Sequence, residues 1–430
     1  MRVGRKVLFL FFISGVVILA GCSNAAAIKS NSGNTNGVTS SSILVGGVAS
    51  LTGPLTADFA PVFNGVEAYF DVVNASGGVD GRKINFAYPL DDGSNPSQDV
   101  DQVRNLISQF HVFAVVGVAT PSFAGLDLLK TNNVPTFGMA INPGWGGPSN
   151  LFGVGGSFTN FTTPQTEVAY LAQQLHVKTA AVLAYDVSES YQGCEGVVNG
   201  LQKFGIKVGF QDFGIPAPAV DLTSDIARIK SSGSDLVVSC MDVSGNLLMS
   251  QELKAANMTN VNQYWLDGYD PSTLSNPSNT SLMDGVYFLI GHAPFSVAET
   301  DPSLYPGMVA YLSAMKEYFP NVEPSEASIN GWLSADLFVQ GLKKVGRDLT
   351  REKLISAINS MTDYTAGGIL PPVDWKVDHT GGNIDCQAFV QAEGSTYIPR
   401  FGSGSSAFTC FPSPILKGTI KPLNAVPPGG

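Results

Sequence analysis

The chain has 430 residues, of which 44% are hydrophobic and 14% charged, so it can bury substantial cores and is neither disordered nor a coiled coil. Its length exceeds that of one ordinary domain and favours two. A formal net charge of −11 argues against nucleic acid as a partner.

The first 22 residues have the pattern of an export signal. Met1 to Lys6 carries three positive charges, and Val7 to Leu19 is almost wholly apolar but shorter than a membrane-spanning helix, which needs about 20 residues. The ending Leu19-Ala20-Gly21-Cys22 resembles the bacterial lipobox, whose cysteine becomes the lipid-carrying first residue; a plain secretory signal is the alternative. We therefore expect a lipoprotein signal peptide at 1–21, lipidation of Cys22, and a flexible tether at 22–42, which is rich in Ser, Asn, Gly and Ala.

From Ile43 onward, short apolar runs alternate with longer segments of helical period. The pattern predicts strands at 43–51, 83–88, 113–117 and 135–139, and helices at 59–74, 96–110 and 123–131. Strands separated by helices of this length indicate a mainly parallel sheet with helices on both faces.

The alternation begins again after Phe158. We expect helices at 165–175, 191–204, 222–232 and 245–256, with strands at 179–185, 208–213 and 236–239. A strand at 286–290, helices at 304–318, 327–345 and 351–360, and a β-rich tail to about residue 412 complete the pattern. The predicted fold class is α/β, with two doubly wound parallel-sheet domains.

Four cysteines follow the tether, and export would place them where disulfides persist. Cys194 lies early in a predicted helix and Cys240 ends a strand of the same layer, whereas Cys386 and Cys410 both lie in the β-rich tail. Of the three possible pairings we therefore expect Cys194 with Cys240 and Cys386 with Cys410. Their spacing matches no zinc pattern, so we expect neither a metal site nor a cofactor.

Several short segments, weak one by one, together carry a family resemblance. They are ILVGGV at 43–48, LTGPL at 51–55, NG at 64–65, NASGGVDGRKI at 74–84, DDGSNP at 91–96, VVG at 115–117 and YQG at 191–193. From residue 43 to about 399 the chain resembles the branched-chain amino-acid-binding (Leu/Ile/Val-binding) family of type I periplasmic binding proteins, the solute receptors of ABC transporters. Taken by themselves, Asp91 and Asp92 indicate caps of the following helix more readily than catalytic or metal-binding carboxylates.

The resemblance implies two discontinuous domains joined by three hinge segments. The first domain would comprise residues 43–157 and 294–360, and the second 158–293 and 361–430. The hinge would lie near 158–162, 291–294 and 361–366. Ligand would bind between the domains, where the carboxyl ends of the strands meet, in keeping with the general rule for open parallel sheets.

Twelve residues in the loops at these strand ends are candidate ligand contacts. Hydroxyls and loop N–H groups can hold a carboxylate or carbonyl, and aromatic rings can cover an apolar or planar body. For each residue an ordinary loop position is the alternative. The candidates are Thr52, Phe59, Thr120, Ser122, Ala140, Ile141 and Asn142 in the first domain, and Tyr185, Tyr191, Asp242, Tyr269 and Asp270 in the second.

Two departures from the family pattern leave the ligand open. Ile141 stands where amino-acid binders usually have a Ser or Thr, and Tyr269 aligns with an acid that pairs with the ammonium group. Asp267, Asp270 or Asp242 could supply that charge instead, since a cation in a dry cleft needs an anion nearby. An amino acid, an amide or a small organic acid would fit this loop chemistry.

The resemblance therefore implies an extracytoplasmic, lipid-anchored solute-binding protein, acting as a monomer, that passes a small polar molecule to an ABC permease. A lipid-anchored sensory receptor with the same ligand clamp is the alternative. We do not expect an enzyme, because the sequence holds no G-x-S-x-G, Walker, H-E-x-x-H or complete G-x-G-x-x-G motif and its four histidines are scattered.

Overall fold

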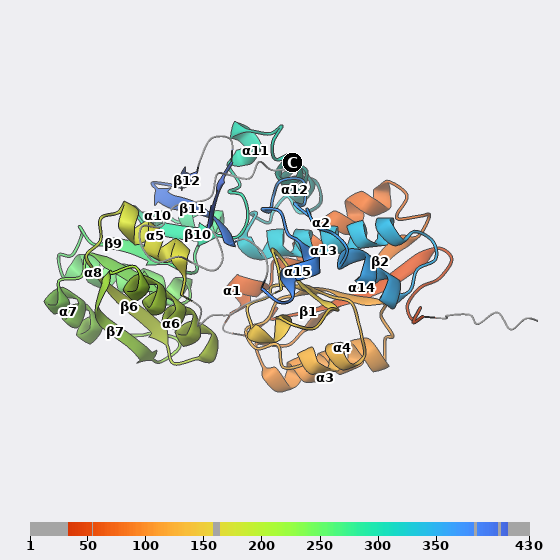
Figure 1. Cartoon of the computed structure of the whole chain (residues 1–430), viewed down its shortest axis with the longest axis horizontal. Helices are drawn as coiled ribbons and strands as arrows, with labels where there is room; N and C mark the ends of the chain where they lie inside the picture. Colours follow the sequence, from red (N-terminus) through yellow and green to blue (C-terminus); the bar gives the residue numbers. More distant parts are fainter. Residues whose placement is uncertain (1–32, 54, 158–163, 382–384, 403–405, 412–430) are drawn as a thin grey trace, which may run out of the picture. The chain divides into compact units, whose positions relative to one another are not determined.

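A computed structural model describes residues 33–53, 55–157, 164–381, 385–402 and 406–411 (Figure 1). The expected signal peptide, Cys22 and the hinge segment at 158–162 lie outside the described residues. Within the described ranges, no helix is both long and apolar enough to span a bilayer.

Five parallel strands form the first sheet, in the order β2-β1-β3-β4-β5. Neighbouring residues of the central strand face opposite layers: Val115 packs with α3 and α4, and Val116 packs with α2 and α13. Every residue of β3 is buried, as expected for a parallel strand covered on both faces. The strands are β1 (Ser42–Ala49), β2 (Lys83–Asp91), β3 (Ala114–Val118), β4 (Thr136–Gly138) and β5 (Leu151–Gly153).

The helices of this sheet come from two distant parts of the chain. They are α1 (Thr56–Phe59), α2 (Val62–Ala75), α3 (Pro96–Ser108) and α4 (Leu126–Thr131), followed much later by α12 (Pro306–Tyr318), α13 (Glu326–Val345) and α14 (Arg351–Ile358). The sequence predicts one helix over 59–74, whereas the structure has two. Pro61 caps the second one, because proline lacks the N–H that a continuous helix would need there.

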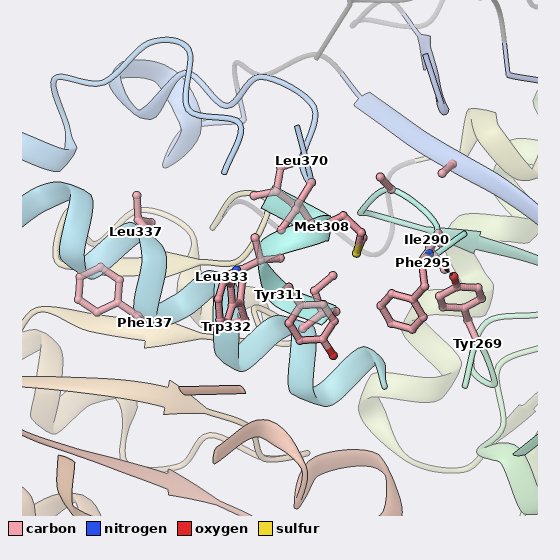
Figure 2. Packing of buried hydrophobic residues seen from close by; sticks show 14 of the residues in the cluster. Phe137, Tyr269, Ile290, Phe295, Met308, Tyr311, Trp332, Leu333, Leu337 and Leu370 are labelled. Carbon is pink, nitrogen blue, oxygen red and sulfur yellow. Dashed lines mark hydrogen bonds between the residues drawn. The ribbon is translucent and has the colours of Figure 1, made fainter. Parts of the chain in front are cut away.

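Helices α2 and α13 cross with their backbones almost in contact. A Cβ atom on Gly65 would lie 1.8 Å from the Ser328 carbonyl oxygen, and one on Gly331 would lie 1.9 Å from that of Val62. Trp332 packs edge-on against Tyr69 with ring centroids 4.6 Å apart. Figure 2 shows Trp332, Leu333 and Leu337 along α13 with Phe137 beside the helix, and all four belong to one buried core. Glycine is therefore required at both crossing positions.

The second sheet has eight strands, in the order β12-β11-β10-β9-β8-β6-β7 with β13 paired to β11. Helices α5 and α6 cover one face and α7 and α8 the other, so it is also doubly wound. The first five strands are parallel and the last three antiparallel, which resolves the predicted β-rich tail. The strands are β6 (Thr179–Tyr185), β7 (Lys207–Ile215), β8 (Leu236–Ser239), β9 (Asn262–Trp265), β10 (Tyr287–Ile290), β11 (Asp385–Glu393), β12 (Thr396–Arg400) and β13 (Phe408–Phe411).

The remaining elements complete both layers. The helices of the second sheet are α5 (Thr166–Gln174), α6 (Ser188–Lys203), α7 (Thr223–Ser232) and α8 (Val243–Ala255). Shorter ones are η1 (Pro143–Trp145), α9 (Pro271–Ser275), α10 (Pro277–Met283), α11 (Val297–Thr300) and α15 (Trp375–Asp378). The α/β fold class with parallel sheets and helices on both faces is confirmed.

Both expected disulfides are present. Cys194 of α6 bonds to Cys240 just after β8, and Cys386 of β11 bonds to Cys410 of β13. Cys386 and Cys410 are direct partners across the antiparallel pair, so this bond fastens β13 to the sheet.

Segment 373–379, which the resemblance assigns to the second domain, packs on the first sheet instead. The Trp375 ring lies 5.3 Å from that of Phe152 in β5, and the Asp378 carboxylate accepts the Ser157 N–H at 2.6 Å. The chain thus leaves the first sheet after α15 and reaches the second sheet again at β11.

Candidate ligand-binding site

Asp91, at the end of β2, organises the loop that follows β1. Its carboxylate accepts the N–H groups of Leu51, Thr52 and Gly93 at 2.8 to 3.2 Å and the Thr52 hydroxyl at 2.6 Å. Burial opposes the charge, but these hydrogen bonds outweigh it and lower the pKa of Asp91. The Thr52 hydroxyl therefore already donates its hydrogen bond to Asp91 and is not free to donate one to a ligand. Neither Asp91 nor Asp92 caps α3, a role that Asn95 takes.

The other first-sheet candidates lie in two adjoining loops. Thr120 is buried directly after β3, and Ser122 is half-buried two residues later. The Asn142 amide, in the loop after β4, donates to the Pro121 carbonyl at 3.0 Å and reaches Glu189 of α6 at 3.5 Å. This hydrogen bond connects the loop after β4 to the loop after β3, which we call the β3 loop.

Phe59 and Ile141 come together in a small apolar cluster at this edge of the sheet. Phe59 is 7% exposed and packs with Ala119, while Ile141 and Leu51 lie against the same cluster half-buried. Ala140 is also half-buried but packs against the α3 and α4 side. The side chain that replaces the expected hydroxyl at 141 therefore adds to an apolar wall.

Tyr185 and Asp242 form a pair at the carboxyl edge of the second sheet. The Tyr185 hydroxyl donates to the Asp242 carboxylate at 2.6 Å, and the same carboxylate oxygen caps α8 by accepting the Gly245 N–H at 2.9 Å. Burial, followed by this hydrogen bond, raises the pKa of the Tyr185 hydroxyl. Tyr191 lies apart from the pair, half-buried against the α5 and α6 layer.

Tyr269 belongs to the core beside the second hinge segment. Its hydroxyl accepts the Phe295 N–H at 2.9 Å, and its ring lies 4.6 Å from that of Tyr397 and 5.7 Å from that of His292. Figure 2 shows Tyr269 beside Phe295. Asp270, the next residue, caps α9 through the Ser272 N–H at 2.7 Å.

Two acidic residues that the sequence analysis did not select join this region. Asp58 lies in α1, and burial followed by the charges of Asp242 and Asp270 raises its pKa to about 6. Glu326 begins α13, and burial followed by the charges of Asp270 and Asp58 raises its pKa to about 7. Residues more than 260 positions apart thus act on one another electrostatically.

Asp267 completes the group. Burial, followed by the charges of Asp58, Glu326 and Asp242, raises its pKa well above the ordinary value. We call the five carboxyl side chains Asp58, Asp242, Asp267, Asp270 and Glu326 the acidic basin. In the described part of the chain, the charges that act on Asp58 and Glu326 all belong to other carboxyls of the basin. The basin therefore lacks an internal counterion.

The basin is not a metal centre by its geometry. No three His, Cys, Asp or Glu side chains among the described residues converge closely enough to hold a metal ion. A surface hollow of about 530 Å³ lies elsewhere, lined by residues of α9, α10 and the β11–β12 turn. It contains none of the twelve candidate residues.

Residues 42–396 match the sequence model of a family described as periplasmic binding protein. The chain belongs to this family. The family resemblance noted from the motifs is therefore confirmed. Leu/Ile/Val-binding protein homolog 7 of Brucella suis biovar 1 is 23% identical over 382 residues, which cover 84% of this chain and 88% of that protein.

Solved structures share the fold of this family member. A fatty acid ABC transporter substrate-binding protein from Thermomonospora curvata has a TM-score of 0.70 at 18% identity, covering 85% of this chain and 93% of that one. An R. palustris solute-binding protein in complex with benzoate has a TM-score of 0.65 at 18% identity, covering 83% and 95%. A branched-chain amino acid transporter substrate-binding protein from Streptococcus pneumoniae, in complex with isoleucine, has a TM-score of 0.67 at 16% identity. The match covers 84% of this chain and 100% of that one. These ligands differ so widely that the fold does not select among them.

Proposed function

We propose that this periplasmic binding protein is an extracytoplasmic, lipid-anchored receptor that captures a small molecule and delivers it to an ABC importer. The family match, the relatives named Leu/Ile/Val-binding protein and the signal-like pattern of the first 22 residues support this role. We further propose that it performs no chemistry on the ligand.

The acidic basin favours a ligand that carries a positive charge. Five carboxyl groups without an internal cation disfavour an anionic guest, whereas a protonated amine or amidine would neutralise them. Among the ligands compatible with the loops, we therefore propose one with a cationic nitrogen, such as an amino acid or an amine. The cluster of Phe59 and Ile141 would face its apolar part.

The proposed clamp has two lobes. The first comprises residues 43–157 with 294–381 and the second comprises 164–290 with 385–411, because the segment that contains Trp375 packs on the first sheet. The third hinge crossing then lies between α15 and β11, later than the resemblance suggests. A ligand that touches both lobes would favour their closed arrangement.

A thermal-shift screen of the mature chain with Cys22 replaced by serine tests this function. The panel contains amino acids, amines, amides, carboxylic acids and sugars at pH 7.5. A ligand at 100 times its Kd stabilises the folded form by about 2.7 kcal/mol, so a cationic compound should raise Tm measurably.

Product analysis of the same mixtures should find every compound unchanged. Stabilisation by carboxylic acids alone would contradict the ligand class, and turnover would contradict the receptor role. Crosslinking of the liganded protein in membranes should capture a permease, while capture of a signalling protein would favour the sensory alternative.

A further inference from the structure

Two wholly buried carboxyl groups lie behind the β3 loop, outside the acidic basin. Asp92 follows β2 and Asp99 lies in the first turn of α3, and both are 0% exposed. One oxygen of Asp92 accepts the Ser50 hydroxyl at 2.7 Å and the Ser94 N–H at 2.8 Å. One oxygen of Asp99 accepts the Gly125 N–H at 2.6 Å. These bonds connect the end of β1, the end of β2, helix α3 and the β3 loop.

The second oxygen of each carboxyl has no hydrogen-bond partner. Asp92 Oδ2 and Asp99 Oδ1 are buried, and neither has a hydrogen-bond partner of good geometry among the described residues; the Ala124 N–H also lies near the Asp99 carboxyl. A buried carboxylate without partners for its oxygens is costly, and two such charges close together are costlier still. A proton on Asp99 would remove one of these two buried charges.

The surrounding titratable groups do not supply a counterion. Asp91 is bound by the β1 loop, and on α3 Arg104 is exposed and paired with Asp101. On α4, Asp127 and Lys130 are both exposed. Burial raises the pKa of Asp99 to about 7; the Gly125 N–H opposes this effect and the charge of Asp92 adds to it.

We propose that Asp92 and Asp99 are a positioning pair that holds one proton, and that this proton keeps the β3 loop, with Thr120 and Ser122, docked on α3. The proton resides on Oδ1 of Asp99, so that Oδ2 still accepts the Gly125 N–H. The Asp92 carboxyl is held in place by the two hydrogen bonds that one of its oxygens accepts. The inference rests on the proposed function only in giving the β3 loop a ligand to contact.

Loss of this proton places a second charge in the same buried space. That repulsion is relieved when the Asp99 side chain separates from its neighbours, which breaks the bond to Gly125 and releases the β3 loop. A carboxyl whose folded pKa is raised contributes stability that is complete below about pH 4 and is lost as the pH rises through about 7.

The pH dependence of Tm for the ligand-free protein tests the pair without relying on any ligand. In Asp99→Asn the amide oxygen still accepts the Gly125 N–H but the side chain cannot ionise. We expect its Tm advantage over the wild type to be about 3 °C larger at pH 8 than at pH 5. Asp127→Asn on exposed α4 should follow the wild type at both pH values. An Asp99→Asn profile parallel to that of the wild type would overturn the proposal.

Carboxyl ¹³C NMR of the wild type measures the titration directly and does not depend on whether a variant folds. One buried aspartate should titrate near pH 7, and Asp92→Asn should lower its midpoint because the neighbouring charge is gone. If no aspartate outside the acidic basin titrates above pH 6.5, or if the titration near pH 7 persists in Asp99→Asn, the pair holds no proton and the inference is wrong. With a ligand identified, Asp99→Asn should bind it more tightly than the wild type does at pH 8.5.

Discussion

Ligand affinity should fall steeply as the pH is lowered from 8 to 5. The acidic basin attracts a cation only through its ionised carboxylates, and Asp58 and Glu326 have pKa values raised to about 6 and about 7 by burial and by other basin carboxyls. Below these values each group must release a proton before it can pair with the ligand. Affinity therefore rises with pH, first through 6 and then through 7.

The size of the effect follows from the titration of each group. At pH 5 a carboxyl with a pKa of about 6 is about one-tenth ionised, so a ligand that requires Asp58 charged binds about tenfold more weakly than at pH 8. If the ligand also requires Glu326 to be charged, its affinity at pH 5 falls by a further factor of up to about one hundred, because that carboxyl has a pKa of about 7. The unliganded protein should change in the opposite sense, because raised pKa values of carboxyls lower its stability as pH rises from 4 to 7.

Isothermal titration calorimetry with the compound found in the screen measures both quantities. Repeating the titration in buffers of different ionisation enthalpy counts the protons released, and we expect between one and two near pH 6. Asp58→Asn should weaken binding at pH 8 by tenfold or more and flatten the profile between pH 5 and 6.5. Glu299→Gln, an exposed acid on α11, should change neither. Proton uptake on binding would refute the role of the basin. An affinity that does not change between pH 5 and 8 would refute it as well.

Three further outcomes are expected. Cys22→Ser should release the protein from membranes or leave it unprocessed, as shown by fractionation, and a processed, membrane-bound variant would contradict lipidation. Gly331→Ala should lower the free energy of unfolding by about 3 kcal/mol because its Cβ meets the facing α2 backbone, whereas Ser313→Ala, at an exposed position of α12, should have little effect in the same denaturant titration. Replacing Cys386 and Cys410 together by serine should cost about 3 kcal/mol, and an unchanged transition midpoint would show that the bond adds nothing.

Local pattern predicts the long elements well. The buried β3 and the helix that begins after Asn95 occur where the alternation of apolar segments places them, because burial and capping are local properties. The strands β5 and β9 are not predicted from the sequence; β9 begins with the polar residues Asn262 and Gln263 and so lacks the apolar run that marks the equally short β8. Pro61 breaks a predicted helix that is otherwise continuous in hydrophobic period.

In the candidate site, too, the sequence predicts contacts at the ends of strands but not contacts between distant segments. Tyr185 and Asp242 were selected because both follow strands, and the structure joins them directly. Asp58 and Glu326 were missed because neither directly follows a predicted strand and nothing in sequence links α1 to the start of α13. Position after a strand likewise could not reveal that Tyr269 turns its hydroxyl toward Phe295.

The glycine crossing of α2 and α13 has a consequence for biogenesis. A ribosome delivers residues 62–75 long before residues 326–345, so the apolar side of the first sheet stays uncovered until more than three-quarters of the chain has been synthesised. During that interval the N-terminal half cannot complete its core, and contacts of such long sequence separation form slowly. The core of the first lobe therefore closes only after residues 326–345 have joined it, which would suit a chain that, as proposed here, is exported before it folds.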